Sequence, residues 1–138
     1  MSCWRLAHRT SGQIVVERLS LADTFWGRLC GLQFRRPLPA GTGLLLVPCG
    51  SIHTMWMRFA IDVAMLDRSG RVLYVRRAVR PWRYVHAPRG THAVLETAAG
   101  DLKVAKDDLV VLHGQGSKAR KHLDQFIVDD SPTPCGER

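Results

Sequence analysis

The polar side chains between residues 51 and 62 lie in a segment that is otherwise largely apolar. Ser51 and His53 are two residues apart, so an extended backbone would place both on one side. Arg58 and Asp62 follow, four residues apart, at the start of an apolar run. Hydroxyl, imidazole and guanidinium groups together suit an anion such as a carboxylate, a phosphate or an acidic sugar. The segment therefore predicts a polar pocket near residues 51–62 for a small anionic or carbohydrate-like ligand.

Two acidic residues offer other chemistry. Asp62 and Glu96 each lie in an apolar segment, and a carboxylate pair could catalyse hydrolysis with assistance from His53. The same three side chains could hold a metal, although their spacing matches no recognised ligand pattern. Alternatively, Arg58, Asp62 and Glu96 form a buried ion network that only stabilises the fold. Binding is favoured over catalysis, and neither a metal nor a cofactor is predicted.

The four cysteines indicate neither a disulfide framework nor a zinc site. Cys3, Cys30, Cys49 and Cys135 form no C-x-x-C pair, which structural zinc sites usually contain. Cys49 lies four residues before His53, so a cysteine–histidine nucleophile pair is an alternative that the sequence leaves open. A buried thiol is the simpler interpretation of Cys49.

Positive charge is concentrated in one part of the chain. The protein has 20 Lys and Arg against 12 Asp and Glu, a formal net charge of +8. Seven of the arginines fall between Arg68 and Arg89, a stretch without acidic residues. Arginines interleaved with aromatic residues can hold phosphates and stack on bases, so nucleic-acid binding is an alternative function. The residues that would carry it are Arg76, Arg77, Arg80, Trp82 and Arg83.

Short apolar segments separated by turn residues predict a mainly β (α+β) protein. Strands are expected at Trp4–Arg9, Ile14–Leu19, Leu44–Val47, Ile61–Leu66, Val72–Val79, Ala93–Thr97 and Leu109–His113. One helix is expected at about residues 21–30, because apolar residues recur there at helical spacing after a capping serine. The segment Pro81–Gly90, with two prolines, is expected to be a loop. These elements predict a small, partly closed β-barrel or a strongly bent antiparallel sheet, with the helix across one end.

Length and composition fit a single domain. The chain has 138 residues, of which 46% are hydrophobic, enough for one core. The β-rich domain is expected over residues 1–113, and the polar residues 114–138 are expected to form a partly disordered extension. No apolar run approaches the roughly 20 residues of a membrane span, and the N-terminus lacks the apolar core of a signal peptide. A cytoplasmic monomer without membrane contact is therefore predicted.

The run from Cys49 to Asp67 closely resembles the signature of a widespread prokaryotic family, the domain of unknown function 192. Its Ser-Ile-His-Thr lead-in, its Trp-Met-Arg core and the following Ile-Asp match the family pattern, and further blocks match at Gly31–Arg35 and Ala93–Gly100. The resemblance covers residues 13–113. Gln33 and Ala60 depart from the pattern, where the family usually has Met and Pro.

The resemblance implies a compact β-rich barrel with little helix, and it implies no reaction. The polar residues that the family pattern shares with this chain form the expected ligand-binding set: Arg35, Ser51, His53, Thr54, Arg58, Asp62 and Glu96. His53, Asp62 and Glu96 are the candidates for catalysis within that set. A structural or protein-interaction module without a small ligand is the remaining alternative.

Overall fold

Ten β-strands make up the secondary structure of the part of the chain that the structure describes. The computed structural model describes residues 3–22, 39–47, 51–53, 59–115 and 128–129. The strands are β1 (Cys3–His8), β2 (Ile14–Ala22), β3 (Thr42–Leu46), β4 (Ser51–His53), β5 (Ile61–Leu66), β6 (Val72–Val79), β7 (Tyr84–His86), β8 (Ala93–Ala98), β9 (Val110–Gln115) and β10 (Val128–Asp129). No helix occurs among these described residues.

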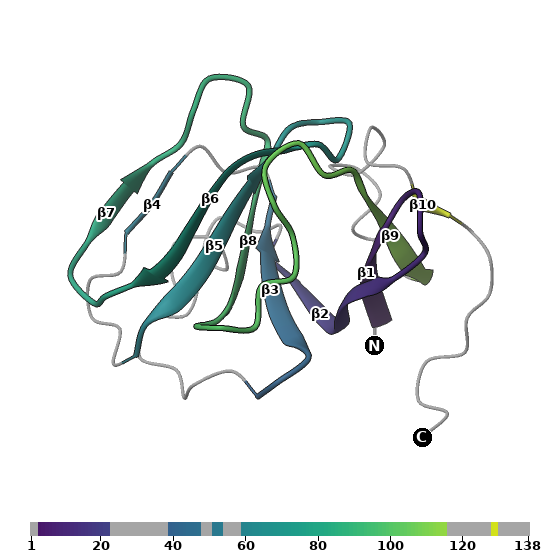
Figure 1. Ribbon diagram of the computed structural model, residues 1–138, viewed down its shortest axis with the longest axis horizontal. Coiled ribbons are helices and arrows are strands. Elements are labelled where there is room, and N and C mark those ends of the chain that lie inside the picture. Colours follow the sequence, from purple (N-terminus) through teal and green to yellow (C-terminus); the bar gives the residue numbers. More distant parts are fainter. Residues whose placement is uncertain (1–2, 23–38, 48–50, 54–58, 116–127, 130–138) are drawn as a thin grey trace.

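Eight of the strands form one curled sheet, in the order β10-β9-β1-β2-β3-β8-β5-β6 (Figure 1). Neighbouring strands are antiparallel except for the parallel pairs β2–β3 and β9–β10. The sheet curls until the start of β6 meets the start of β9, where Arg71 and Leu109 form a bridge. Beside it, the Val110 N–H donates to the Gly70 carbonyl at 2.9 Å. This seam confirms the predicted mainly β, partly closed barrel.

The inner face of the curled sheet carries the larger of two hydrophobic clusters. Strand side chains alternate in direction, so every second residue of a strand reaches this face. The cluster includes Trp4, Leu6, Val16, Leu19, Leu45, Ala64, Leu66, Val72, Leu95, Leu102, Val104, Val110 and Leu112. Two of these, Leu102 and Val104, come from the connection between β8 and β9. That connection therefore packs into the barrel, where it can be held by polar groups of the sheet.

The outer face of β3, β8 and β5 is buried as well, because a second, two-stranded sheet lies against it. β4 and β7 pair antiparallel and form a separate sheet, which shares no strand pairing with the curled sheet (Figure 1). Val85, at the centre of β7, is 1% exposed and packs in one cluster with Val63 and Met65 of β5. Strand β5 is thus buried on both faces, which explains its nearly continuous apolar sequence.

Two predicted elements differ from the structure. Leu21 and Ala22, expected to begin a helix, continue β2 and pair in parallel with Leu45 and Leu46 of β3, because strand pairing outweighs the helical spacing of a few apolar residues. The rest of the expected helix, residues 23–30, lies outside the described residues. The expected loop Pro81–Gly90 contains strand β7, which is too short to reveal a period in the sequence.

The turn between β5 and β6 follows the sequence signal Asp67-Arg-Ser-Gly. Oδ1 of Asp67 accepts hydrogen bonds from the Ser69 N–H (2.8 Å), the Ser69 hydroxyl (2.6 Å) and the Arg71 N–H (3.0 Å). Burial alone would raise the pKa of Asp67, but the hydrogen bonds from Ser69 and Arg71 outweigh it and lower that pKa. The ionised carboxylate therefore stabilises the turn at neutral pH.

Candidate functional site

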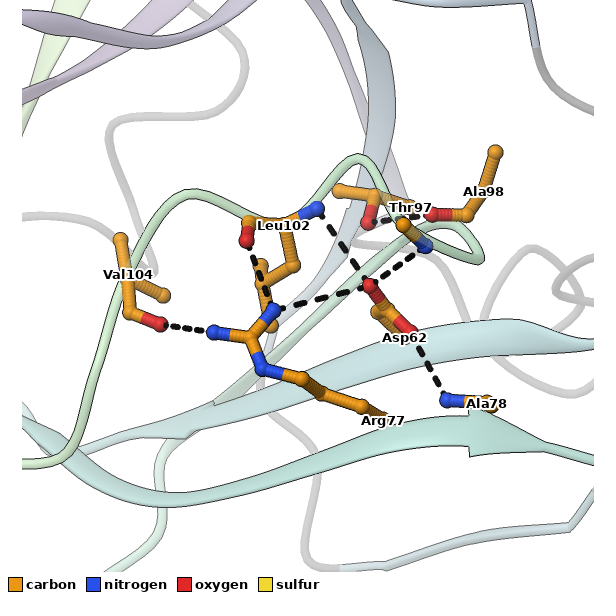
Figure 2. A network of polar contacts seen from close by, with 8 residues as sticks. Asp62, Arg77, Ala78, Thr97, Ala98, Leu102 and Val104 are labelled. Atoms are coloured by element: carbon orange, nitrogen blue, oxygen red, sulfur yellow. Dashed lines mark hydrogen bonds and ion pairs between the residues drawn. The ribbon is translucent and has the colours of Figure 1, made fainter.

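Asp62, the second residue of β5, is a buried carboxylate at the centre of a polar network (Figure 2). It is 1% exposed. Its Oδ1 accepts a hydrogen bond from the Ala78 N–H at 2.8 Å. Its Oδ2 accepts hydrogen bonds from the N–H groups of Gly100 at 2.9 Å and Leu102 at 3.4 Å. Both oxygens are engaged within the fold, so the carboxylate ties β5 to β6 and to the segment after β8.

Arg77 of β6 completes this network. Its Nη1 lies 3.7 Å from Oδ2 of Asp62 and donates to the Leu102 carbonyl at 2.8 Å, while Nη2 donates to the Val104 carbonyl at 2.9 Å. The Arg77 side chain is 51% exposed, so the ion pair itself contributes little to stability. The two hydrogen bonds to carbonyls give the guanidinium of Arg77 a structural role.

The contact between Asp62 and β6 forms at a β-bulge. The register of β5 against β6 shifts between Ile61 and Val63, so β6 contains an extra residue there. Ala78 lies in this bulge with a φ of +52°, in the left-handed region. This conformation costs a residue with a Cβ about 1–2 kcal/mol. The hydrogen bond to Asp62 therefore stabilises a backbone segment that is strained on its own.

Replacing Ala78 by Gly is expected to raise the free energy of unfolding by about 0.5–1 kcal/mol, because relief of the left-handed strain exceeds the entropy cost of glycine. Urea unfolding of both proteins measures the difference. Ala105→Gly is the matched control, since Ala105 is exposed and is not among the described residues with positive φ. A loss of stability in Ala78→Gly as large as in Ala105→Gly would contradict the strain argument.

Asp62 and Glu96 lie on opposite faces of the curled sheet. In the β5–β8 pairing Asp62 is opposite Thr97, and Glu96 is opposite Val63. Residues that oppose each other directly point to the same face. Val63 belongs to the outer cluster, whereas Asp62 accepts a hydrogen bond from Leu102, a member of the inner cluster. This topology gives neither a carboxylate pair in one cleft nor one buried network that contains both acids.

Glu96 faces the side of the sheet that β7 covers. It is 4% exposed and lies opposite Leu44 of β3 and Val63 of β5, both members of the outer cluster. A glutamate is rarely buried to this extent without compensating interactions. Because Leu44 and Val63 belong to the outer cluster, Glu96, unlike Asp62, lies on the face of the curled sheet that β7 covers.

The β4–β7 sheet presents two rings to solvent. Tyr84 is 60% exposed and His86 is also exposed, with ring centroids 6.2 Å apart and planes inclined by 32°. Val85 between them is buried. Since side chains alternate in direction along a strand, the rings of Tyr84 and His86 point to the opposite side, toward solvent. Arg83, the preceding residue, is exposed as well. Phenol, imidazole and guanidinium groups thus lie on three of four consecutive positions.

Strand β4 brings two of the predicted site residues to this sheet. The backbone register places Ser51 opposite His86 and His53 opposite Tyr84. Three other predicted residues, Arg35, Thr54 and Arg58, lie outside the described residues. The remaining acidic candidate, Asp62, belongs to the network on the inner face.

Sequence reasoning missed Tyr84 and His86 as site residues. Two nearby prolines indicated a loop, so the alternation of Tyr-Val-His was not interpreted as a strand with an outward face. Within the described ranges, no group of three or more His, Cys, Asp or Glu could hold a metal ion. In the same part of the chain, no helix has the length and apolar character to cross a membrane.

Comparison with protein families tests the resemblance noted in the sequence. A family model described as DUF192, uncharacterized ACR, matches residues 6–111. The chain belongs to the DUF192 family. The match begins in β1 and ends in β9, so the DUF192 domain contains the Asp62 network and the β4–β7 sheet.

Curated relatives are UPF0127 proteins. One from Thermococcus sibiricus is 35% identical over 103 residues, which covers 69% of this chain and 64% of that protein. Another from Pyrococcus furiosus is 31% identical over 109 residues, which covers 67% of this chain and 90% of that protein. The chain thus spans slightly less than two thirds of the first relative and most of the second.

Solved structures share the fold of this DUF192 member. A protein of unknown function from Novosphingobium aromaticivorans matches with a TM-score of 0.66 at 24% identity, covering 78% of this chain and 82% of that chain. A protein from Sinorhizobium meliloti, described as a candidate transcription regulator, matches with a TM-score of 0.66 at 21% identity, covering 79% and 91%. At these identities the likeness concerns the fold alone.

Proposed function

We propose that this domain binds a small anionic, carbohydrate-like ligand at the outer side of the β4–β7 sheet. The proposal is based on the exposed ring pair of Tyr84 and His86, whose centroids are 6.2 Å apart. A tyrosine ring offers an apolar face to a sugar ring, and its hydroxyl group can form hydrogen bonds. The imidazole of His86 and the guanidinium of Arg83 suit the anionic group of such a ligand.

The two-stranded sheet provides a defined scaffold for this site. Val85 anchors β7 in the outer cluster, and strand-borne side chains are held more accurately than side chains of loops. Ser51 and His53 are expected to contribute from β4, where they pair with the ring-bearing residues. The proposed set is completed by Arg35, Thr54 and Arg58. Asp62 is left out because its oxygens are engaged elsewhere, and Glu96 is left out because it is buried on the face of the curled sheet that β7 covers.

A binding role is preferred to hydrolysis for a geometric reason. Hydrolysis of a glycosidic bond by two carboxyl groups requires both to flank the same bond. Asp62 and Glu96 are on opposite faces of the sheet, so they do not supply this arrangement. Binding at the exposed rings needs no carboxylate pair, because it depends only on stacking against the rings and on the negative charge of the ligand.

Thermal unfolding of the full chain with glucuronate, glucose 6-phosphate, inorganic phosphate and uncharged glucose tests the proposal. A ligand that binds only the folded protein stabilises it, by roughly 2.7 kcal/mol at a hundredfold excess over its dissociation constant. We expect a higher unfolding midpoint with the two sugar anions. A smaller shift is expected with inorganic phosphate, and no shift with glucose.

The variant Tyr84→Ala/His86→Ala is expected to lose the shift, and His53→Ala is expected to reduce it. Tyr74→Ala is the matched control, because Tyr74 is a 39% exposed tyrosine on β6, and it should retain the full shift. The proposal fails if neither sugar anion shifts wild-type protein, or if the ring variant responds as wild type does. A phosphate shift equal to that of the sugar anions would contradict the carbohydrate part.

A further inference from the structure

The connection between β6 and β7 presents an exposed tryptophan on a strained backbone. Trp82 is 53% exposed, and its φ of +62° lies in the left-handed region. This conformation is unfavourable for any residue with a Cβ, and only half of the side chain gains from burial. Strained residues of this kind cluster at functional positions. The fold therefore holds a large aromatic side chain at the surface against its local backbone preference.

Arginines flank this tryptophan along the chain. Arg80 and Arg83 are exposed on either side of Trp82, and Arg76 and Arg89 are exposed farther away in sequence. No acidic residue occurs between positions 68 and 95. The connection and the strands that it joins therefore form a surface rich in positive charge.

The acidic residues nearest to the connection in sequence are not part of its exposed surface. Asp67 accepts three hydrogen bonds within the β5–β6 turn, and Glu96 is 4% exposed on the sheet. The guanidinium of Arg77 donates to two main-chain carbonyls of the β8–β9 connection. The exposed residues of the β6–β7 connection are thus mainly arginines and aromatic residues.

A cation and two rings are presented by three consecutive residues. Nη1 of Arg83 makes a long hydrogen bond of 3.5 Å to the carbonyl of Trp82, so the guanidinium lies near the tryptophan backbone. Tyr84 follows and is 60% exposed. Positive charge tracks a phosphate backbone, and aromatic faces accept unpaired bases.

We propose that this surface, formed by Arg80, Trp82, Arg83 and Tyr84, binds single-stranded nucleic acid. One base stacks on Trp82 and the next stacks on Tyr84. Arg80 and Arg83 contact the phosphates that connect them. This inference does not rest on the small-ligand site, although the two surfaces share Arg83 and Tyr84.

A single strand fits these residues better than a duplex or an acidic peptide does. Bases in a duplex are already stacked on their neighbours, so they leave the exposed rings without partners. Carboxylates of an acidic peptide would pair with the arginines but would not use Trp82. Unpaired bases use both the charge and the rings.

Fluorescence anisotropy with a labelled single strand of about 12 nucleotides, long enough for one binding surface, tests the inference on the full chain. We expect binding that weakens steeply between about 50 and 200 mM salt. A duplex of the same sequence is expected to bind less tightly. Polyglutamate of equal charge is expected to compete poorly.

Variants separate stacking from charge. Trp82→Leu is expected to weaken binding by about 5- to 150-fold, the range for loss of one base stack, while Trp82→Phe should retain most of the affinity. Arg80→Gln/Arg83→Gln is expected to reduce the salt slope by about 1.4. Arg18→Gln/Lys106→Gln removes two exposed charges from β2 and the β8–β9 connection and serves as the charge-matched control. Far-UV circular dichroism and urea midpoints establish that each variant is folded.

Three results would overturn the inference: equal affinity of folded Trp82→Leu and wild type, equal affinity for duplex and single strand, or equally strong competition by polyglutamate. The first two would indicate a general electrostatic surface, and the third would favour an acidic protein partner. The sugar-anion shift of Trp82→Leu distinguishes the two proposals. That shift should persist in this variant whether or not the nucleic-acid site is real.

Discussion

Replacing Asp62 by Ala is expected to lower the free energy of unfolding by roughly 3–5 kcal/mol, the range for removal of one partner from a buried charged network. The substitution removes the acceptor for three main-chain donors, those of Ala78, Gly100 and Leu102. A buried donor left without an acceptor costs about 1–3 kcal/mol. The half-exposed Arg77 adds little to this total. Equilibrium urea unfolding measures the loss.

Asp62→Asn refines the interpretation, because it conserves the size of the side chain. The amide retains one acceptor oxygen but turns an NH₂ group toward a donor, so a large loss is still expected. Asp101→Asn is the matched control, since Oδ2 of Asp101 accepts one hydrogen bond, from the Gly41 N–H at 2.9 Å. Because the amide oxygen can still accept this single hydrogen bond, the substitution should cost about 1 kcal/mol or less. If Asp62→Asn costs no more than Asp101→Asn, the network does not stabilise the barrel as described.

The longer strands of the curled sheet and the β5–β6 turn could be predicted from the local sequence because their signals are local. The apolar run Ile61–Leu66 and the alternating segment Val72–Val79 match β5 and β6 in both boundaries. The Asp67-Arg-Ser-Gly signal between them defines the turn, where Asp67 caps the N–H groups of Ser69 and Arg71. Each of these signals lies within a few residues, so no knowledge of distant pairing is needed.

The roles of the two acids could not be predicted, because they depend on pairing between distant strands. Asp62 and Glu96 have similar sequence contexts, because each is an acidic residue in an apolar strand. A one-residue change of register would move either side chain to the other face of the sheet. The observed pairing of Asp62 with Thr97 separates them. The bulge at Ala78, which supplies a donor to Asp62, has no glycine to mark it in the sequence.

The exposed rings of β7 illustrate a second limit. A three-residue strand is shorter than the four to eight residues over which alternation is usually recognised. Its position is determined by Val85 in the outer cluster and by pairing with β4. Only that placement puts Tyr84 opposite His53 and His86 opposite Ser51 in the backbone register. The family resemblance pointed to Ser51 and His53 of β4, and only the fold pairs these residues with β7.

Replacing Gly70 by Ala is expected to lower the free energy of unfolding by about 3–5 kcal/mol, the sum of left-handed strain, overpacking and a lost hydrogen bond. Gly70 has a φ of +89°, and a Cβ there would collide with the carbonyl oxygen of Val110. The colliding atom belongs to the backbone of Val110 and cannot rotate away as a side chain would. The N–H of Val110 also donates to the Gly70 carbonyl at 2.9 Å. Relief of the collision must therefore open the seam between β6 and β9.

Gly100→Ala isolates the part of this loss that comes from the seam. Gly100 has a φ of +88°, almost identical to that of Gly70, but an added Cβ would meet nothing within 4 Å. It should cost only the backbone strain of about 1–2 kcal/mol. Hydrogen exchange at the N–H groups of Val72 and Val110, which bond across the seam, should accelerate in Gly70→Ala more than in Gly100→Ala. Equal stability losses and equal exchange in the two variants would show that the seam contributes little, and that the curled sheet holds its shape through strand pairing alone.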